Sequence, residues 1–402
     1  MTKYLFKDIV LGEEGLLKGP FGSDLKKSLY VPKGKNTYKV YLQENILKED
    51  NDVGEYYISK EYFDKKMSRY EIKENDFIVT CDGTLGEIFQ LKNVKERGII
   101  SSSLLRITLN NEVVDSNYFY YLFKSVIKKA LITKGNNSVL KHLPGVNIIR
   151  NYVVELPEIN IQRKIGNVLK TIDNKIKNNL TICKELERMA KIIYEYWFIQ
   201  YEFPNKDGNP YKLSGGKMIW NEELKKEIPE RWNVRKVGDI LSKIPNTYKY
   251  TSSEYKKDGR FPIIDQSSNY ICGYTDKEED LLKLNDCVVF GDHTKIVKYV
   301  NFNFARGADG TQILNSYDDK LPNYLLYMQI SNMQLVSQGY SRYFKFLKDK
   351  HVIIPEKKIS DMYISKVRIA LEKIKKCREE NKELSNLRDY ILPLLMNGQV
   401  GF

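Results

Sequence analysis

An internal duplication constrains the fold more than any other feature, because segments of the first half of the chain recur in the same order in the second half. Residues 74–79 (ENDFIV) are matched by residues 284–289 (LNDCVV), and residues 184–186 (KEL) recur as residues 382–384. One match of this length carries little weight, but a preserved order across the chain indicates two diverged copies of one structural plan. The chain is therefore predicted to fold as two similar units.

Each copy begins with a polar, glycine-punctuated part that contains short β-like runs. Residues 77–80 (FIVT) and 287–290 (CVVF) are examples, and each copy then runs through a last predicted strand into Pro157 or Pro355. Short apolar runs bounded by turn residues are typical of a mixed, strand-rich globular domain.

A long helix is predicted after the proline in each copy. Apolar residues step by three or four positions for about five or six heptads, the pattern of a helix with one apolar face. A helix of about 40 residues spans ~60 Å, too long to bury that face in a compact domain. We therefore expect the two helices to pair as an intramolecular antiparallel coiled coil. Asn381 on the second stripe fits a polar position that fixes the register, and a frayed surface turn is an equal alternative.

These patterns predict an α+β protein with two strand-rich globular domains held apart by an antiparallel coiled coil, related by pseudo-two-fold symmetry. Such symmetry suits a protein that meets the two strands of duplex DNA in equivalent ways. The expected parts are a first domain over residues 1–157, a central helix over 158–201, a linker over 202–230, a second domain over 231–355 and a C-terminal helix over 356–402.

The charge balance points to an anionic partner. Lys and Arg number 65 against 52 Asp and Glu, a formal net charge of +13, and an excess of this size bears on association. The 29 tyrosines, interleaved with lysine as in residues 248–250, suit a surface that grips phosphates and touches bases or sugars. A drift of composition in an A·T-rich coding sequence explains them equally well.

Other classes of function find little support. No apolar run approaches the ~20 residues of a membrane span and the N-terminus is not a signal peptide, so a cytoplasmic protein without a membrane role is expected. The five cysteines and three histidines lack metal-ligand spacing, so no metal site is predicted. No phosphate-binding loop of the G-x-x-x-x-G-K-[ST] type is present. Residues 292–294 (DHT) suggest a proton-transfer site, but a polar turn at a strand end explains them better. We predict a binding protein without catalytic residues.

Several motifs resemble those of the specificity subunits of type I restriction-modification systems, and the resemblance covers essentially the whole chain. The motifs that carry it are Gly19-Pro20-Phe21-Gly22-Ser23, the helix start from Gln162 to Ile176, Met189-Ala190 with Trp197-Phe198, residues 215–218 leading to 229–232, and residues 290–294, 306–312 and 392–398.

The resemblance implies a non-catalytic subunit in which each globular domain recognises one half of a bipartite, asymmetric sequence in double-stranded DNA. The paired helices would set the unread spacer and dock two adenine-N6 methyltransferase subunits, and a restriction subunit with ATP-driven translocase and nuclease activity would join them. The pocket for a flipped adenine would belong to the methyltransferase. S-adenosylmethionine, ATP and Mg²⁺ would be ligands of those partners and not of this chain.

The predicted DNA contacts centre on the duplicated segments 135–141 and 339–345, where glycine lets the backbone approach a phosphate and short polar groups with lysine hold it. Arg342 has the donors to pair bidentately with guanine. For Lys141 and Lys345 the alternative is a helix-surface lysine, and for Tyr343 it is a core position. The predicted contacts are Ser23, Lys26, Asn136, Asn137, Ser138, Lys141, Gln266, Tyr340, Ser341, Arg342, Tyr343 and Lys345.

The predicted partner-binding residues lie on the apolar stripes of the two helices. They are Ile165, Ile172, Ile176, Leu186, Ile193, Val367, Leu371, Leu384 and Ile391. Two alternatives remain open, a specificity subunit of a related type II-like methyltransferase and nuclease assembly, and a coiled-coil scaffold with no nucleic-acid role. A self-contained nuclease or methyltransferase has no room for a catalytic domain beside both repeats.

Overall fold

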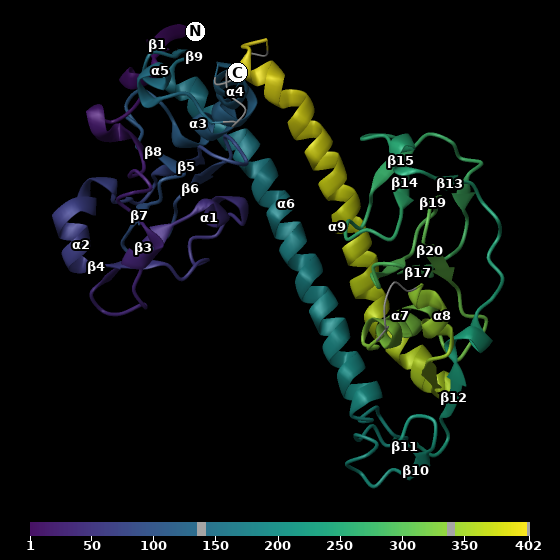
Figure 1. The fold of residues 1–402 in the computed structure, drawn as a ribbon. Helices are drawn as coiled ribbons and strands as arrows, with labels where there is room; N and C mark the ends of the chain where they lie inside the picture. Colours follow the sequence, from purple (N-terminus) through teal and green to yellow (C-terminus); the bar gives the residue numbers. More distant parts are fainter. Residues whose placement is uncertain (135–141, 336–341, 400–402) are drawn as a thin grey trace. The chain divides into compact units, whose positions relative to one another are not determined.

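The computed structural model describes residues 1–134, 142–335 and 342–399, which divide into two compact units (Figure 1). Unit 1 comprises Met1–Asn179 and Glu379–Phe402, and unit 2 comprises Leu180–Arg378. Each unit contains a strand-rich globular part and one segment of each of two long helices. The predicted α+β class is confirmed. No helix in the described ranges is both long and apolar enough to cross a membrane.

Unit 1 is built on two small sheets. Its strands are β1 (Thr2–Leu5), β2 (Leu16–Lys18), β3 (Thr37–Tyr41), β4 (Tyr57–Ser59), β5 (Phe77–Thr80), β6 (Ile88–Gln90), β7 (Gly98–Ile100), β8 (Leu104–Ile107) and β9 (Val153–Leu156). The short helices are α1 (Gln43–Leu47), α2 (Lys60–Tyr62), α3 (Ser116–Leu122), α4 (Lys128–Lys134) and α5 (Val146–Arg150). One sheet has the order β2-β8-β5-β6, the other has the order β4-β3-β7, and β1 pairs with β9.

Unit 2 has a comparable set of elements. Its strands are β10 (Met218–Asn221), β11 (Lys226–Pro229), β12 (Asn233–Lys236), β13 (Lys249–Tyr250), β14 (Phe261–Ile264), β15 (Gly273–Thr275), β16 (Leu281–Leu282), β17 (Cys287–Gly291), β18 (Val297–Val300), β19 (Phe304–Gly307), β20 (Thr311–Leu314) and β21 (His351–Ile354). Its short helices are α7 (Asn323–Ser331) and α8 (Tyr343–Lys348). The sheets have the orders β18-β17-β20 and β13-β19-β14-β15, with β16 against β19.

The strand pairing confirms the duplication inferred from the sequence. In unit 1 β5 is antiparallel to both β6 and β8, and in unit 2 β17 is antiparallel to both β18 and β20. Strand β3 is antiparallel to β4 and parallel to β7, as β14 is to β15 and β19. The first and last strands also pair in both units, β1 with β9 and β12 with β21. Three equivalent pairings in one order are the mark of two copies of one fold.

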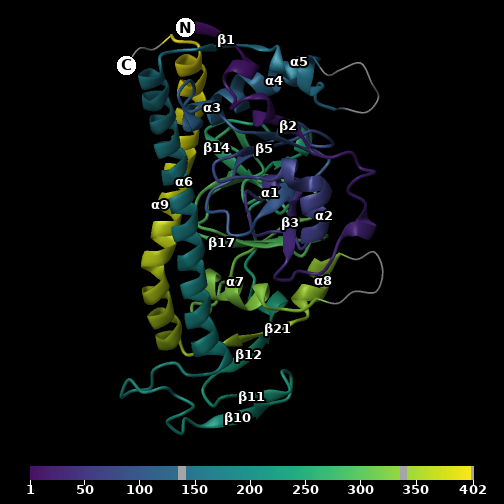
Figure 2. The same ribbon diagram turned by 90° about the vertical axis from the view of Figure 1, so that its left-hand side faces the viewer.

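The long helices are α6 (Ile159–Tyr194), which continues through a π-helical turn (Glu195–Ile199), and α9 (Lys357–Met396). Within each unit their segments lie side by side (Figures 1 and 2). In unit 1 Asp173 pairs with Arg388 at 2.9 Å, and in unit 2 Glu187 pairs with Arg378 at 2.8 Å. In unit 1 Asn179 also contacts Asn381, and in unit 2 Cys183 contacts Ile374 while Ala190 contacts Tyr363. Within each unit the residue numbers rise along α6 as those of the partners fall along α9, so the segments are antiparallel, as predicted. The two-fold relation between the globular parts stays a prediction.

Asn381 occupies the polar position that its sequence spacing suggested. The buried Asn179 on α6 donates from Nδ2 to Oδ1 of Asn381 at 2.9 Å, and Asn381 donates from its own Nδ2 to the carbonyl of Ile176 at 3.3 Å. All three residues belong to unit 1. An amide pair between apolar layers fixes the register of two helices because a slip would leave both amides unpaired.

Both globular parts are held to their helices by aromatic cores. In unit 1 the rings of Phe77 and Phe119 meet edge to face with centroids 5.3 Å apart. In unit 2 the ring of Tyr363 on α9 meets that of Phe198 edge to face at 5.1 Å, and its hydroxyl donates to the carbonyl of Ala190 at 3.3 Å. Phe77 and Phe119 share one buried cluster with Ile165 on α6 and Leu395 on α9, and Phe198 and Tyr363 share another with Val288 on β17, so the long helices pack against the strands of their own unit.

Residues 202–230, predicted as a linker, form an ordered part of unit 2. The ring of Phe203 stacks on Trp232 and on Tyr211, with centroids 4.9 and 4.6 Å apart. Strands β10 and β11 pair antiparallel within this segment. The glycine, proline and asparagine residues of this segment correctly predict turns. They do not predict that aromatic stacking holds these turns against the rest of unit 2.

Candidate nucleic-acid interface

Half of the predicted DNA-contacting residues lie outside the described part of the chain. They are Asn136, Asn137, Ser138, Lys141, Tyr340 and Ser341. The other six, Ser23, Lys26, Gln266, Arg342, Tyr343 and Lys345, are described. Ser23 and Lys26 lie on an exposed loop just after a cleft in unit 1, and the other four belong to one loop cluster in unit 2.

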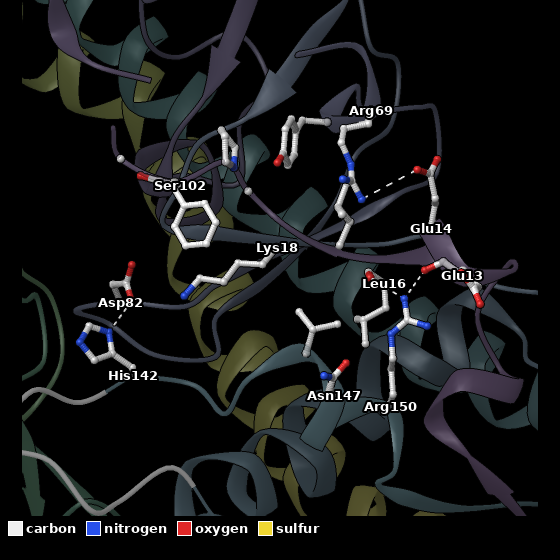
Figure 3. Close-up of a pocket in the computed structure, with 17 residues that line it drawn as sticks. Glu13, Glu14, Leu16, Lys18, Arg69, Asp82, Ser102, His142, Asn147 and Arg150 are labelled. Carbon is white, nitrogen blue, oxygen red and sulfur yellow. Dashed lines mark hydrogen bonds and ion pairs between the residues drawn. The ribbon is translucent and has the colours of Figure 1, made fainter. Parts of the chain in front are cut away.

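The turn at residues 19–23 forms one wall of a cleft in unit 1 with a volume of about 1000 Å³ (Figure 3). Phe21 at this turn is 82% exposed, whereas most phenylalanine side chains in folded proteins are buried. Ser23 and Lys26 follow on the same exposed loop. The cleft is lined by Glu13, Glu14, Leu16, Leu17, Lys18, Gly19, Pro20, Phe21, Gly22, Arg69, Tyr70, Asp82, Ser102, His142, Val146, Asn147 and Arg150.

Two of the three cations at this cleft are partly engaged with acidic neighbours. Arg150 donates to the carbonyl of Glu13, and Arg69 lies 4.0 Å from the carboxylate of Glu14. Lys18 is exposed and has no ion pair within the described residues. Exposed lysine and arginine supply the donors that a nucleic-acid backbone requires, and the rings of Phe21 and Tyr70 also line the cleft.

Gly19 is required where the turn meets the loop between β7 and β8. A Cβ atom at this position would lie 1.9 Å from the carbonyl oxygen of Ser101, which is a backbone atom and cannot move aside as a side chain can. Gly22, three residues further on, has open space around it. The close approach of two backbone segments therefore sets the position of the exposed turn.

The opposite wall of the cleft carries an aspartate–histidine pair. Asp82 follows strand β5, and its Oδ1 lies 2.6 Å from Nδ1 of His142 (Figure 3). The backbone N–H of Leu143 donates to the carbonyl of Cys81 at 3.1 Å, which ties the same two segments together. His142 is half exposed in the cleft. Sequence reasoning missed this residue, because its partner is distant in the chain.

Gln266 of unit 2 is a structural tie between two loops. Its Nε2 donates to the carbonyl of Asp309 at 2.7 Å, and its Oε1 accepts from the N–H of His293 at 3.0 Å. Its backbone carbonyl accepts from the hydroxyl of Thr294 at 2.6 Å. Both ends of the amide are thus engaged within unit 2, so Gln266 positions the loops at residues 291–294 and 307–311 rather than presenting a free amide.

The motif at residues 292–294 anchors the start of helix α8. The carbonyl of Asp292 accepts from the N–H of Tyr343 at 2.9 Å, and its Oδ1 accepts from the N–H of Phe344 at 2.8 Å. Asp292 is 4% exposed. The buried, hydrogen-bonded Asp292 agrees with the prediction of a polar turn at a strand end. The turn contacts the first residues of α8.

Helix α8 presents cations beside these loops. Arg342 and Lys345 are exposed, whereas Tyr343 is half-buried and packs against the core of unit 2. The ammonium of Lys295 lies 4.2 Å from the centroid of the Tyr343 ring. The structure therefore supports the core position for Tyr343 and leaves Arg342 and Lys345 on the surface.

Two lysines are withdrawn from the basic surface. Lys39 in unit 1 donates to the carbonyl of Asn51 at 2.7 Å, and Lys298 in unit 2 donates to the carbonyl of Asp265 at 2.8 Å. Their exposed fractions are 1% and 5%. Burial lowers the pKa of both ammonium groups because it disfavours the charged form. These lysines organise loops and are not available to a phosphate.

The apolar residues predicted to bind a partner face the inside of the units. Ile165, Ile172 and Val367 are only 2%, 8% and 1% exposed. A half-buried group on the same stripes comprises Ile176, Leu186, Ile193, Leu371, Leu384 and Ile391. A partner bound to this structure could not reach the three buried residues, because their side chains fill the cores. The prediction of a partner contact is therefore corrected for these three residues, which occupy core positions.

The outward face of α6 carries a second apolar row that a single-stripe interpretation missed. Ile182, Met189, Ile192, Tyr196 and Ile199, all in unit 2, are between 38% and 54% exposed. Their intervals of seven, three, four and three residues place them along one side of the helix. The helical spacing of this row is visible in the sequence. The buried row on the same helix has the same spacing, so the two rows were not told apart.

The chain resembles known proteins along most of its length. Residues 22–188 match the family described as the type I restriction modification DNA specificity domain. Over 360 residues the chain is 24% identical to the type I restriction enzyme MjaIX specificity subunit of Methanocaldococcus jannaschii, covering 84% of this chain and 80% of that protein. It is 28% identical over 198 residues to the MjaVIII specificity subunit of the same organism, covering 47% and 40%.

A solved structure shares the fold. The crystal structure of the type I restriction-modification system S subunit from M. genitalium aligns with a TM-score of 0.56 at 16% identity, covering 98% of this chain and 95% of that chain.

Proposed function

We propose that this chain is a type I restriction-modification specificity subunit in which each unit reads one half of a bipartite, asymmetric DNA sequence, because residues 22–188 match the DNA specificity domain of that family and 360 residues are similar to a specificity subunit. The observation that carries this proposal is that one strand topology occurs twice, once in each unit. Two similar but diverged readers suit two different half-sites.

In unit 1 the cleft at residues 19–23 supplies the contacts. Lys18 and Lys26 neutralise phosphates, and Phe21 offers an exposed ring that a base or sugar can cover. In unit 2 Lys345 binds a phosphate and Arg342 reads a base edge, since a guanidinium pairs bidentately with guanine in the major groove. The contacts predicted at residues 136–138, 141, 340 and 341 remain part of this proposal.

Partner subunits supply the chemistry. We assign the outward row on α6, from Ile182 to Ile199, to the contact with adenine-N6 methyltransferase subunits, since exposed apolar residues at helical spacing mark a protein interface. In that assembly the long helices set the unread spacer, S-adenosylmethionine binds the methyltransferase, and ATP and Mg²⁺ bind a restriction subunit.

The test is to map N6-methyladenine in DNA from cells that carry this chain together with its methyltransferase. The expected result is a methylated motif of two short, different sequences separated by a fixed, unread gap. A single continuous motif would contradict recognition by two units. Absence of any methylation that depends on this chain would instead favour the scaffold alternative.

A further inference from the structure

Two aspartates occupy equivalent positions in the two copies. Asp82 follows strand β5 and Asp292 follows strand β17, at the same separation in sequence as the matched residues 74–79 and 284–289. Strands β5 and β17 are themselves equivalent, because each is the strand that pairs with two antiparallel neighbours. A shared position on a shared strand points to a shared role.

In unit 2 the aspartate caps a helix that is distant in the sequence. The first N–H groups of a helix have no partner within it. Arg342 precedes α8 but makes no side-chain cap, and Asp292 instead accepts from the N–H groups of Tyr343 and Phe344. A carboxylate at this end is also favoured by the helix dipole. Asp292 thereby fixes where α8 begins and the direction in which the side chains of Arg342 and Lys345 project into solvent.

In unit 1 the equivalent aspartate holds a side chain. Asp82 Oδ1 and His142 Nδ1 are 2.6 Å apart (Figure 3). The neighbouring residues are also joined, because the N–H of Leu143 donates to the carbonyl of Cys81. A carboxylate that accepts from Nδ1–H orients the imidazole and makes Nε2 the nitrogen that can meet a ligand. His142 lines the same cleft as Lys18 and Phe21.

We infer that Asp82 and Asp292 are positioning residues for DNA recognition, and that His142 is an additional DNA-contacting residue in unit 1. Asp82 joins the end of β5 to His142, and Asp292 joins the end of β17 to the first residues of α8, Tyr343 and Phe344. This inference rests on the proposed function. It goes further because it names, in each unit, one aspartate that positions the residues that distinguish the correct half-site from other sequences.

The experiment uses the full chain in complex with its methyltransferase and three DNA substrates. One substrate carries the intact target, and the other two carry one scrambled half-site each, so that discrimination is measured separately for each half. The variants are Asp82→Ala, His142→Ala, Asp292→Ala and Asp292→Asn. Asp207→Ala, an exposed aspartate in the segment 202–230, is the matched control.

We expect Asp292→Ala to lose about tenfold in discrimination at one half-site and to keep the other, since the variant removes the carboxylate that accepts from Phe344 at the start of α8 and leaves unit 1 unchanged. Asp82→Ala and His142→Ala should lose discrimination at the opposite half-site. Asp292→Asn retains an oxygen acceptor and should restore most of the discrimination, which a loss of general stability would not allow. Asp207→Ala should match the unmodified chain.

The outcomes separate the two levels of the argument. If folded Asp292→Ala and His142→Ala keep full discrimination at both half-sites, the positioning role is wrong while the proposed function stands. His142 is half exposed, so its truncation tests unit 1 even if the Asp82→Ala variant fails to fold. If the unmodified complex shows no half-site discrimination, the proposed function itself fails.

Discussion

Asn179 on α6 donates a hydrogen bond of 2.9 Å to Oδ1 of Asn381 on α9, and the repeat aligns these two residues with Cys377 and Cys183 of unit 2. The two cysteines are likewise buried between the helix segments, next to Ile374. Equivalent layers of the two copies thus hold an amide pair in unit 1 and a thiol pair in unit 2. The amide pair is the more selective, because an unpaired buried amide costs more than a displaced thiol.

Asn381→Leu should lower the free energy of unfolding by about 1–3 kcal/mol, because Asn179 is 1% exposed and loses an acceptor. Chemical denaturation of the full chain measures this change. Replacing both asparagines by leucine should recover much of the loss, and the double-mutant cycle gives the pair's coupling energy. Additive effects of the two single changes would show that the amides do not act as a pair.

Gly19→Ala should destabilise unit 1 by about 1–3 kcal/mol, because the new methyl group meets the carbonyl oxygen of Ser101 and the backbone must shift. Gly22→Ala is the matched control in the same turn and should be nearly neutral, since no atom lies within 4 Å of its added Cβ. Denaturation monitored by circular dichroism compares the two. Equal effects would mean that the turn is not held by its contact with Ser101.

Arg342→Ala and Lys345→Ala should affect DNA binding in different ways. Loss of the guanidinium should cost about 1–3 kcal/mol against the preferred base and relax specificity at one position of one half-site. Loss of the lysine should weaken binding to all sequences and reduce the slope of log K against log salt by about 1. Salt titrations of the methyltransferase complex on intact and substituted targets distinguish the two, and identical behaviour of both variants would contradict the assignment.

Met189→Glu combined with Ile192→Glu should weaken methyltransferase binding at least tenfold while the chain stays folded, because both side chains are about half exposed and glutamate is a good helix former. Sedimentation of mixtures with the methyltransferase measures the complex. Leu47→Glu, which alters an equally exposed residue on α1, is the control and should bind normally. Unchanged binding by the double variant would move the interface away from this row.

The sequence predicted the architecture closely where the signal is periodic or repeated. The prolines at 157 and 355 mark the boundary in each copy, since β9 ends at Leu156 and β21 at Ile354 and each long helix begins within three residues of its proline. Order along the chain was enough to identify the duplication, because loops change length while sheet-forming segments keep their sequence.

The candidate site was predicted less well, because its contacts join residues that are distant in the chain. Gln266 looked like a residue that faces DNA, yet its amide is satisfied by His293 and Asp309. His142 carried no local pattern that could reveal Asp82 as its partner. Periodicity also cannot tell which of two apolar rows on one helix is buried, and here the row that includes Ile165 is inside while the row that includes Met189 is outside.

The stacked rings of Phe203, Tyr211 and Trp232 bear on how relatives of this chain can exchange their DNA preferences. In a hybrid of two relatives joined at residues 204–230, Phe203 would come from one parent and Trp232 from the other. The two rings would then stack less well than in either parent. A crossover inside α6, ahead of Tyr194, would transfer the stack intact. Successful hybrids, natural or engineered, should therefore be joined within the helix and carry the whole 202–230 segment with the second reader.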